Sequence, residues 1–205
     1  MIILKNLEDK FNKISSDSEN YIMSYSDSDS VRLNETKVVV SKGALYNIRP
    51  YEIERAGFKI GKKLNKLPAN VKNTHIYHFD SLERISLIEI FGQTSNIINK
   101  EFCIYEGDNL ERIYFTSAGM LRNISLSVYN DGLIEKDFNW GMYGCSVSDY
   151  VYEDSILKKI YVQQKEHAES SFTEFEVVFS YKNAIIDTIK NVFPNGYEEQ
   201  RYPAR

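Results

Sequence analysis

Apolar and polar residues in the second half of the chain follow a local pattern that recurs five times between residues 77 and 196. Each copy has an aromatic residue, a few polar or small residues, and then an aliphatic-rich stretch that is typical of a strand. The aromatic residues are Phe79, Tyr105, Tyr129, Tyr152 and Tyr181, whose numbers differ by 26, 24, 23 and 29. Two strands of about 3–10 residues with two turns need a similar length. The pattern therefore predicts a sheet that is built hairpin after hairpin.

The alternation of side chains within the repeats predicts what covers each strand. Residues 85–91 are apolar on both sides, which favours a strand buried on both faces. In residues 121–129, Asn123, Ser125 and Ser127 lie opposite an apolar face, and we expect this polar face to be in water. The segments Asn130-Asp131-Gly132 and Asn195-Gly196 are hairpin signals, because these residue types accept the positive φ of tight turns.

The first 72 residues have a different pattern. Leu4, Leu7, Phe11 and Ile14 have helical spacing, and the serine- and aspartate-rich segments that follow favour loops. We expect a short helix and one strand within residues 1–36. The next residues predict a strand at 38–40, a turn at 41–43 and a returning strand at 44–48. Pro68 and the polar residues after it mark a boundary, so the expected domains are 1–72 and 73–205.

These elements predict a mainly β (β-rich α+β) protein, with an extended antiparallel sheet of successive hairpins and a short helical N-terminal portion. Its 205 residues are 42% apolar and 26% charged, which is ordinary for a globular protein.

No stretch approaches the roughly 20 apolar residues of a membrane span, and Glu8 and Asp9 interrupt any signal-like core. The only cysteines, Cys103 and Cys145, form no CxxC motif, which fits a reducing compartment. We therefore expect a cytoplasmic protein.

Charge is distributed unevenly along the chain. Residues 1–75 contain 13 Lys and Arg against 9 Asp and Glu, whereas residues 76–205 contain 12 against 20. Residues 101–154 alone have ten acids and three bases. If the hairpins stack side by side, their acidic turns lie on a common edge, which would attract basic proteins and repel nucleic acid. The ordinary alternative is that acidic turns serve solubility, because Asp and Asn favour turns in any protein.

Two further segments stand out by composition. Residues 55–72 carry six basic residues and no acid, which is more typical of a solvated face than of a nucleic-acid or membrane patch. The segment 138–144 combines Trp140 and Tyr143 with glycines, and such aromatics are frequent in interface hot spots as well as in cores. The predicted partner-binding residues are Glu106, Asp108, Glu111, Asp131, Glu135, Trp140, Tyr143, Glu153 and Asp154.

Metal and thiol chemistry have weak signals. His75 and His78 are three residues apart, so in a strand they point to opposite faces and do not converge on a metal. Asp27 and Asp29 lack the glycine and the final acid of a calcium loop. Cys103 lies in an apolar run and is expected to be a buried filler. We expect no metal, no cofactor and no disulfide.

Catalysis is the alternative to binding. The sequence has none of the common nucleophile, metalloprotease or phosphate-loop motifs, and we expect a protein that is not an enzyme. The alternative is a carbohydrate-binding or glycoside-hydrolysing β protein, because hydrolysis needs two carboxyl groups about 5–9.5 Å apart. Asp131 with Glu135, or Glu153 with Asp154, would be the pair. A third interpretation is a domain that assembles through its sheet edges, which a stable homodimer would indicate.

The stretches HFDSLERI, YEGDNLERI and YVYEDSILKKI share an aromatic residue, an acidic turn and an aliphatic residue near a base. This arrangement resembles the YD repeat of RHS-family proteins, although Glu83, Glu111 or Leu157 stands where that family has glycine. The resemblance implies successive β-hairpins. In overall character the chain also resembles immunity proteins of bacterial polymorphic toxin systems, including contact-dependent inhibition. That resemblance implies a cytoplasmic inhibitor of a cognate toxin domain, which the acidic turns suggest is basic, with no nucleic-acid or membrane partner.

Overall fold

The computed structural model describes residues 2–27, 37–169 and 171–203. Three helices are present in these residues, namely α1 (Ile2–Ser15), α2 (Ser18–Ser26) and α3 (Glu52–Arg55). The strands are β1 (Lys37–Lys42), β2 (Lys62–Leu64), β3 (Thr74–Phe79), β4 (Ile85–Phe91), β5 (Ile98–Glu106), β6 (Asn109–Phe115), β7 (Leu121–Asn130), β8 (Leu133–Gly141), β9 (Gly144–Glu153), β10 (Ile156–Glu166), β11 (Thr173–Lys182), β12 (Ile185–Val192) and β13 (Glu198–Tyr202). The predicted mainly β fold with a short helical N-terminal portion is confirmed.

The strands of the described residues form one antiparallel sheet in the order β13-β12-β11-β10-β9-β8-β7-β6-β5-β4-β3-β1-β2. From β3 to β13 each strand pairs with the next one in sequence, as the hairpin pattern predicts. The boundary expected at residue 72 falls between β2 and β3, and both of these strands belong to the same sheet. Residues from both sides of this boundary therefore contribute to one continuous sheet.

The recurring aromatic residue has the same structural role in all five hairpins, because it lies directly opposite an aliphatic residue of the following strand. The pairs are Phe79–Ile85, Tyr105–Leu110, Tyr129–Ile134, Tyr152–Leu157 and Tyr181–Ile186. Such cross-strand pairs contribute roughly 0.2–1 kcal/mol each. Beside the pair, every hairpin except β5–β6 has a register shift, which bends the strands and increases their twist.

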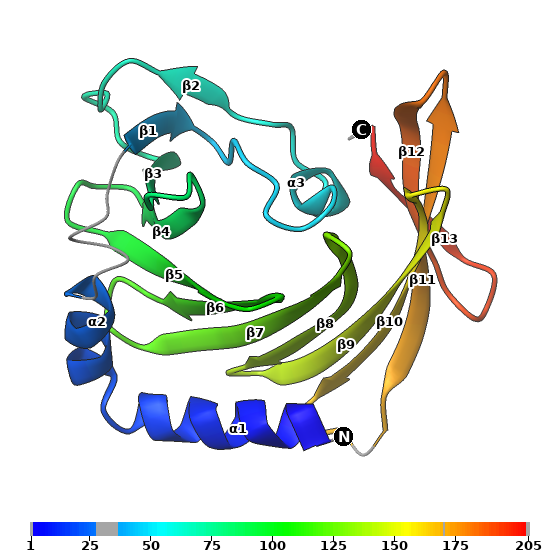
Figure 1. Cartoon of the computed structure of the whole chain (residues 1–205), viewed down its shortest axis with the longest axis horizontal. Helices are drawn as coiled ribbons and strands as arrows, with labels where there is room; N and C mark the ends of the chain where they lie inside the picture. Colours follow the sequence, from blue (N-terminus) through cyan, green and yellow to red (C-terminus); the bar gives the residue numbers. More distant parts are fainter. Residues whose placement is uncertain (1, 28–36, 170, 204–205) are drawn as a thin grey trace.

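The sheet is strongly curved, and different segments cover its two faces (Figure 1). Helices α1 and α2 lie on the convex face, where Leu7 and Ile14 pack with Phe102 and Ile124. The connection between β1 and β2, residues 43–61 with α3, lies within the concave face. Strand β4 is buried on both faces, as its apolar pattern predicts.

The N-terminal residues depart from the expectation after the first helix. Helix α1 is confirmed, and Leu4, Leu7 and Ile14 are buried. Residues 18–26, which contain part of the expected loop, form a second helix instead, and the strand expected within residues 1–36 does not occur among residues 2–27. A helix aligns Tyr21 and Tyr25 on one face, and both pack against the convex core. The prediction for Asp29 falls outside the described residues.

Residues 44–48 were expected to return as a strand, and this prediction is wrong. They leave the sheet and cross its concave face, where the backbone N–H of Leu45 donates to the Tyr77 hydroxyl at 2.9 Å. The Tyr46 ring meets Tyr77 edge-on, at 5.0 Å between centroids. Further along, Tyr51 packs on Phe179 of β11 at 5.6 Å. The connection thus joins the apolar clusters near the two ends of the strand order.

The expectation of a wet polar face on β7 is also wrong. Ser125 and Ser127 are both 0% exposed, because the β1–β2 connection covers them. The guanidinium of Arg49 donates to Ser125 Oγ at 3.0 Å, and Ser127 donates to Asp137 at 2.6 Å. Polar side chains can be buried here because each finds a hydrogen-bond partner.

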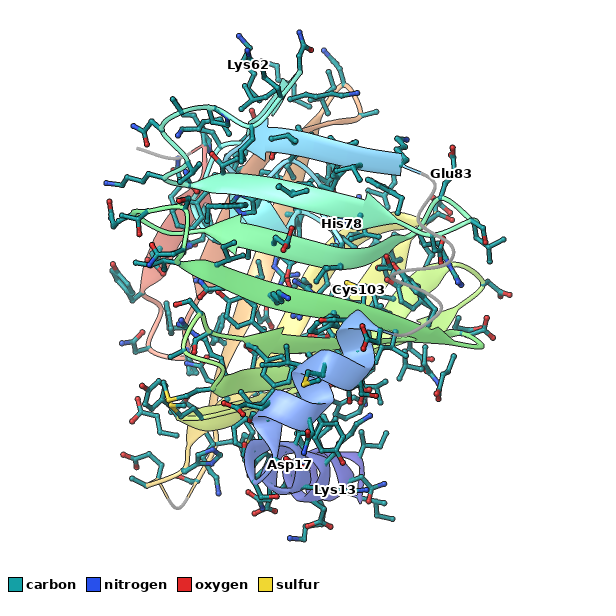
Figure 2. The ribbon with its side chains drawn as sticks, turned by 90° about the vertical axis from the view of Figure 1, so that its left-hand side faces the viewer. Lys13, Asp17, Lys62, His78, Glu83 and Cys103 are labelled. Atoms are coloured by element: carbon teal, nitrogen blue, oxygen red, sulfur yellow. The ribbon has the colours of Figure 1, made fainter. Side chains whose placement is uncertain are left out.

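The two outer strands are poor templates for pairing with another chain. Strand β2 has three residues, two of which are Lys62 and Lys63, and Figure 2 shows Lys62 at the margin of the molecule. Strand β13 has five residues, three of them charged, and Pro203 follows it directly. Short, charged edges oppose edge-to-edge association. None of the helices in the described residues has the length and apolar character of a membrane-spanning segment.

Candidate protein-binding site at one end of the sheet

The turns of alternate hairpins emerge at the same end of an antiparallel meander, and here three central turns bring acids together. The connections β5–β6, β7–β8 and β9–β10 carry Asp108, Asp131 and Asp154 and no basic residue. Two more acids, Glu106 and Glu153, are the last residues of the strands that lead into two of these connections. We call this group the acidic turn row, and its members are Glu106, Asp108, Asp131, Glu153 and Asp154. All five are exposed. Figure 2 labels Glu83, which lies in the β3–β4 turn at the same end of the sheet.

The opposite end of the sheet is different. The connections β4–β5, β6–β7 and β8–β9 contain no charged residue. Neighbouring strands are about 4.8 Å apart, so the three acidic turns fall within roughly 20 Å. Neighbouring turns of the row are two strands apart, about 10 Å, which is close to the Debye length of about 8 Å at physiological ionic strength. Their negative fields therefore overlap in part, and overlap more at low salt. Between β4 and β9 the connections at the opposite end are uncharged, and the next one along, β10–β11, carries a single acid, Glu169.

Backbone geometry explains the residue types in these turns. Asp131 and Gly132 have φ of 48° and 78°, and Asp154 and Ser155 have φ of 50° and 62°. Two consecutive positive φ values are the requirement of the type I′ turn, which matches the twist of hairpin strands. Aspartate tolerates this conformation better than most side chains. The acids at these two positions therefore also serve the turns.

A cavity of about 510 Å³ lies behind the acidic turn row, between the concave face and the β1–β2 connection. We call it the tyrosine pocket, because four tyrosines line it, namely Tyr51, Tyr129, Tyr152 and Tyr181. Ile134 and Leu157, the cross-strand partners of Tyr129 and Tyr152, line it as well. Gly132, Ser155 and Ala184, from three successive hairpin turns, also line it. The pocket thus reaches the turns that carry Asp131 and Asp154.

Three tyrosines of the pocket, Tyr129, Tyr152 and Tyr181, are neutral at physiological pH. Burial raises the pKa of Tyr152 to about 12 and also raises the pKa of Tyr129 and Tyr181. Their hydroxyls therefore carry no charge, and their ring faces remain the electron-rich surfaces of the pocket. Tyr51 has a φ of 52°, which is unusual for a bulky residue and marks a strained position. The backbone is thus held in a costly conformation at the residue that closes the pocket.

A buried network of charges holds the β1–β2 connection in place. Arg49 donates to Asp137 of β8 at 2.8 Å, and Arg112 of β6 donates to Glu52 at 2.6 Å and to Glu101 at 2.8 Å. Burial alone would raise the pKa of Glu52, but Arg112 and Arg49 outweigh it and lower the pKa to about 2. Because Glu52 follows Tyr51, the network positions the tyrosine over the pocket.

The structure separates the predicted partner-binding residues into groups. Five of them form the acidic turn row, and Glu135 is exposed near the same end of β8. Glu111 lies on the convex side of β6, where it accepts from Lys10 of α1 at 2.5 Å. Trp140 also packs against the α1 side of the sheet, at 4.8 Å from the His167 ring. Glu111 and Trp140 are therefore placed where they hold α1, away from the row.

Tyr143 lies at the other end of the molecule. It is 75% exposed in the β8–β9 turn and lines a separate cavity of about 490 Å³ with Lys165 and Glu166. Strand β8 separates it from Asp131, and its nine residues span about 30 Å at roughly 3.3 Å per residue. The expected combination of acidic turns with Trp140 and Tyr143 is thus not brought together.

Aromatic residues do accompany the acidic turn row, but they are the tyrosines of the repeat. The sequence pattern predicted Tyr129, Tyr152 and Tyr181 as the aromatic residues of the repeat, but not as site residues. The sequence did contain evidence for their position. Each repeat aromatic residue stands one or two residues before a turn, so it must lie at the turn end of its hairpin. No sequence pattern indicated that Tyr51 lies at the pocket, because its position there depends on how the β1–β2 connection crosses the sheet.

The described residues show how the histidines and cysteines of the chain are placed. Among those described, no group of three or more His, Cys, Asp or Glu side chains could hold a metal ion. His78 contacts Glu89 at 3.1 Å, and burial lowers the pKa of His75 to about 4. Cys103 is a buried filler, as expected, and burial raises the pKa of its thiol. Cys145 packs in the cluster on the opposite face, so the two thiols are not neighbours.

Comparison with known proteins adds no identity, because the chain matches no protein-family model and no curated protein. The candidate site therefore rests on the geometry and charge of the chain itself.

Proposed function

We propose that this protein is a cytoplasmic immunity or antitoxin-type inhibitor, which binds a basic toxin domain through the acidic turn row. The bound partner would have its active site, or the path of its substrate, covered by this end of the sheet. The single observation that carries the proposal is the concentration of five exposed acids and no base in, or directly before, three turns at one end of the sheet. The resemblance to immunity proteins is the reason for proposing that the bound partner is a toxin domain.

Two features support a binding role for the row. Of its five acids, Glu153 has an ion-pair partner within the described residues, Lys158 at 3.8 Å, while no ion pair is found there for the other four. Acids left unpaired at a surface contribute to the long-range field that steers a cationic partner. A concave pocket lined with aromatic rings directly adjoins them, and buried aromatics are the residue types that dominate binding energies in interfaces.

The carbohydrate alternative receives less support from the concave face. Hydrolysis of a glycoside needs a carboxyl group with a raised pKa as the general acid. The carboxylates that converge on this face, Glu52, Glu101 and Asp137, are each paired with Arg49 or Arg112. The pKa of Glu52 is lowered to about 2, which is the wrong direction for a general acid.

The test is partner capture from the native host, followed by binding measurements with the purified partner. The variant Glu106→Lys/Asp108→Lys/Glu153→Lys reverses three exposed charges and leaves the positive-φ positions of the turns unchanged. We expect one stoichiometric basic partner with the native chain, and an association rate about 10- to 100-fold lower for the variant. Rising salt should weaken native binding in parallel, and the partner's activity should be inhibited in the complex.

The matched control reverses three exposed acids near the other end of the sheet, as Glu166→Lys/Glu169→Lys/Glu174→Lys. This variant has the same net charge as the first, so it separates a local effect from a change in total charge. Circular dichroism checks that both variants fold. Equal binding by the two variants, or a partner that is indifferent to both, would rule out the acidic turn row as the interface.

A further inference from the structure

We propose that the tyrosine pocket receives the guanidinium group of an arginine on the protein partner, between the rings of Tyr129 and Tyr152 and beside Asp131 and Asp154. This inference rests on the proposed function and specifies its chemistry. It makes the acidic turn row the rim of an interface whose anchor is one inserted side chain.

The first argument is that the chain itself repeats this arrangement twice. Arg84 lies over the Tyr105 ring, 4.3 Å from its centroid, and is paired with the Asp80 carboxylate at 2.8 Å. At the other end of the row, Lys158 lies 5.8 Å from the Tyr181 ring centroid and 3.8 Å from Glu153. In both places a repeat tyrosine, a carboxylate from the turn end and a cation form a trio.

At the two central hairpins the same trio lacks its cation. Tyr129 and Tyr152 have Asp131 and Asp154 two residues further along the chain, in the turns. Among the described residues, no basic side chain lies over either ring, in contrast to Tyr105 and Tyr181. Both rings line the pocket, and the turn residues beside the two aspartates, Gly132 and Ser155, line it as well. Ring faces and negative charge are therefore available to a cation from outside.

The second argument concerns the electrostatics of the pocket. Since burial raises the pKa of Tyr129 and Tyr152, both rings stay neutral. Attraction comes from the ring faces and the rim carboxylates, and it acts against the positive charges of Arg49 and Arg112 near Tyr129 and of Arg55 near Tyr152. A cation over a tyrosine ring is attracted by the negative face of the ring, and the attraction is stronger when water is excluded. The guanidinium of arginine is planar and weakly hydrated, so it stacks between rings at a lower desolvation cost than the lysine ammonium.

The first experiment uses the full chain with ring-¹³C-labelled tyrosine and a capped glycine peptide that contains one central arginine. Tyr129→Phe and Tyr152→Phe assign the two ring signals. We expect saturable shifts of both signals with millimolar affinity. A peptide with citrulline, the neutral isostere of arginine, should bind about tenfold more weakly, because the loss of charge removes both attractions. Equal shifts with citrulline, or no shift with arginine, would overturn the proposal.

Two variants test the placement. Tyr152→Leu removes the ring face, and we expect it to abolish the Tyr129 shift, whereas Tyr152→Phe keeps the ring and should retain it. Because Tyr152 packs in the concave core, Asp131→Asn/Asp154→Asn serves as a second variant that leaves the core untouched. Asparagine accepts the positive φ of these turns, and loss of two carboxylates should weaken binding roughly threefold or more. Native affinity in this variant would contradict the role of the rim.

The outcomes separate the pocket from the proposed function. If the pocket variants bind the purified partner as well as the native chain does, and the Glu106→Lys/Asp108→Lys/Glu153→Lys variant does not, the row binds the partner without the pocket. If the arginine peptide binds as expected but no protein partner responds to charge reversal, the pocket stands and the inhibitor hypothesis fails. A lysine peptide that binds more tightly than the arginine peptide would overturn the choice of guanidinium.

Discussion

At the scale of single residues, burial has changed the chemistry of several titratable groups. His75 in β3 is 9% exposed, and its Nδ1 atom has no hydrogen-bond partner among the described residues. Burial lowers its pKa from about 6.5 to about 4, so the native protein disfavours the imidazolium form. The sequence placed His75 and His78 on opposite faces of a strand, but it could not show which face would exclude water.

His75 should make the protein acid-sensitive in a defined range. Between pH 6.5 and 4 the unfolded chain binds a proton at His75 and the native chain does not, so stability falls as the pH is lowered. The loss approaches roughly 3 kcal/mol and is absent above pH 6.5. Urea unfolding at pH 7, 5.5 and 4.5 measures it, and His75→Phe should remove most of the slope. An unchanged slope in this variant would assign the acid sensitivity to other groups.

At the scale of elements, the hairpin turns show how local chemistry and backbone geometry interact. The turn at Asp131-Gly132 has the residues that a type I′ turn prefers, and its position was predicted from the sequence. The turn at Asn183-Ala184 has φ values of 52° and 62°, although alanine is poorly suited to the second position. The repeat imposes this geometry, because the pairs on both sides set the register of the hairpin.

Ala184→Gly should stabilise the protein by roughly 0.5–1 kcal/mol, since glycine relieves the cost of a left-handed alanine. Ala118→Gly is the matched control in the β6–β7 turn, where alanine does not have a positive φ. That change should instead lower stability by roughly 0.5 kcal/mol through the flexibility of the unfolded chain. Thermal unfolding of both variants measures the difference, and shifts of the same sign would contradict the explanation.

At the scale of the whole molecule, the β1–β2 connection determines what the sheet can do. It crosses the concave face, covers Ser125 and Ser127 of β7, and reaches β13 at α3, where Arg201 donates to the backbone oxygen of Arg55 at 2.9 Å. Two buried ion pairs join the connection to the sheet, Arg49 with Asp137 and Glu52 with Arg112, and Arg112 also pairs with Glu101 within the sheet. Removing one member of such a network leaves a buried charge without a partner.

Arg112→Ala should therefore destabilise the protein by about 3–5 kcal/mol, because Glu101 stays buried without its ion pair. Lys159→Ala, which breaks the exposed pair with Glu176, is the control and should cost less than about 1 kcal/mol. Chemical denaturation measures both. The double variant Arg112→Met/Glu101→Leu should recover part of the loss, and a similar cost for the two single variants would show that the network does not hold the connection.

The sequence by itself determined the hairpin order, the turns and helix α1, because these depend on contacts between residues that are close along the chain. It also predicted that acidic turns would share one end of the sheet, since alternate turns of a meander must do so. Only the tertiary structure decided what covers each face. The path of residues 43–61 depends on contacts with strands up to 146 residues away, such as that of Arg55 with Arg201. Patterns between neighbouring residues cannot predict contacts at that separation. The same long-range packing brought the repeat tyrosines together with Tyr51 around the tyrosine pocket. It also placed Trp140 and Tyr143 away from the acidic turn row.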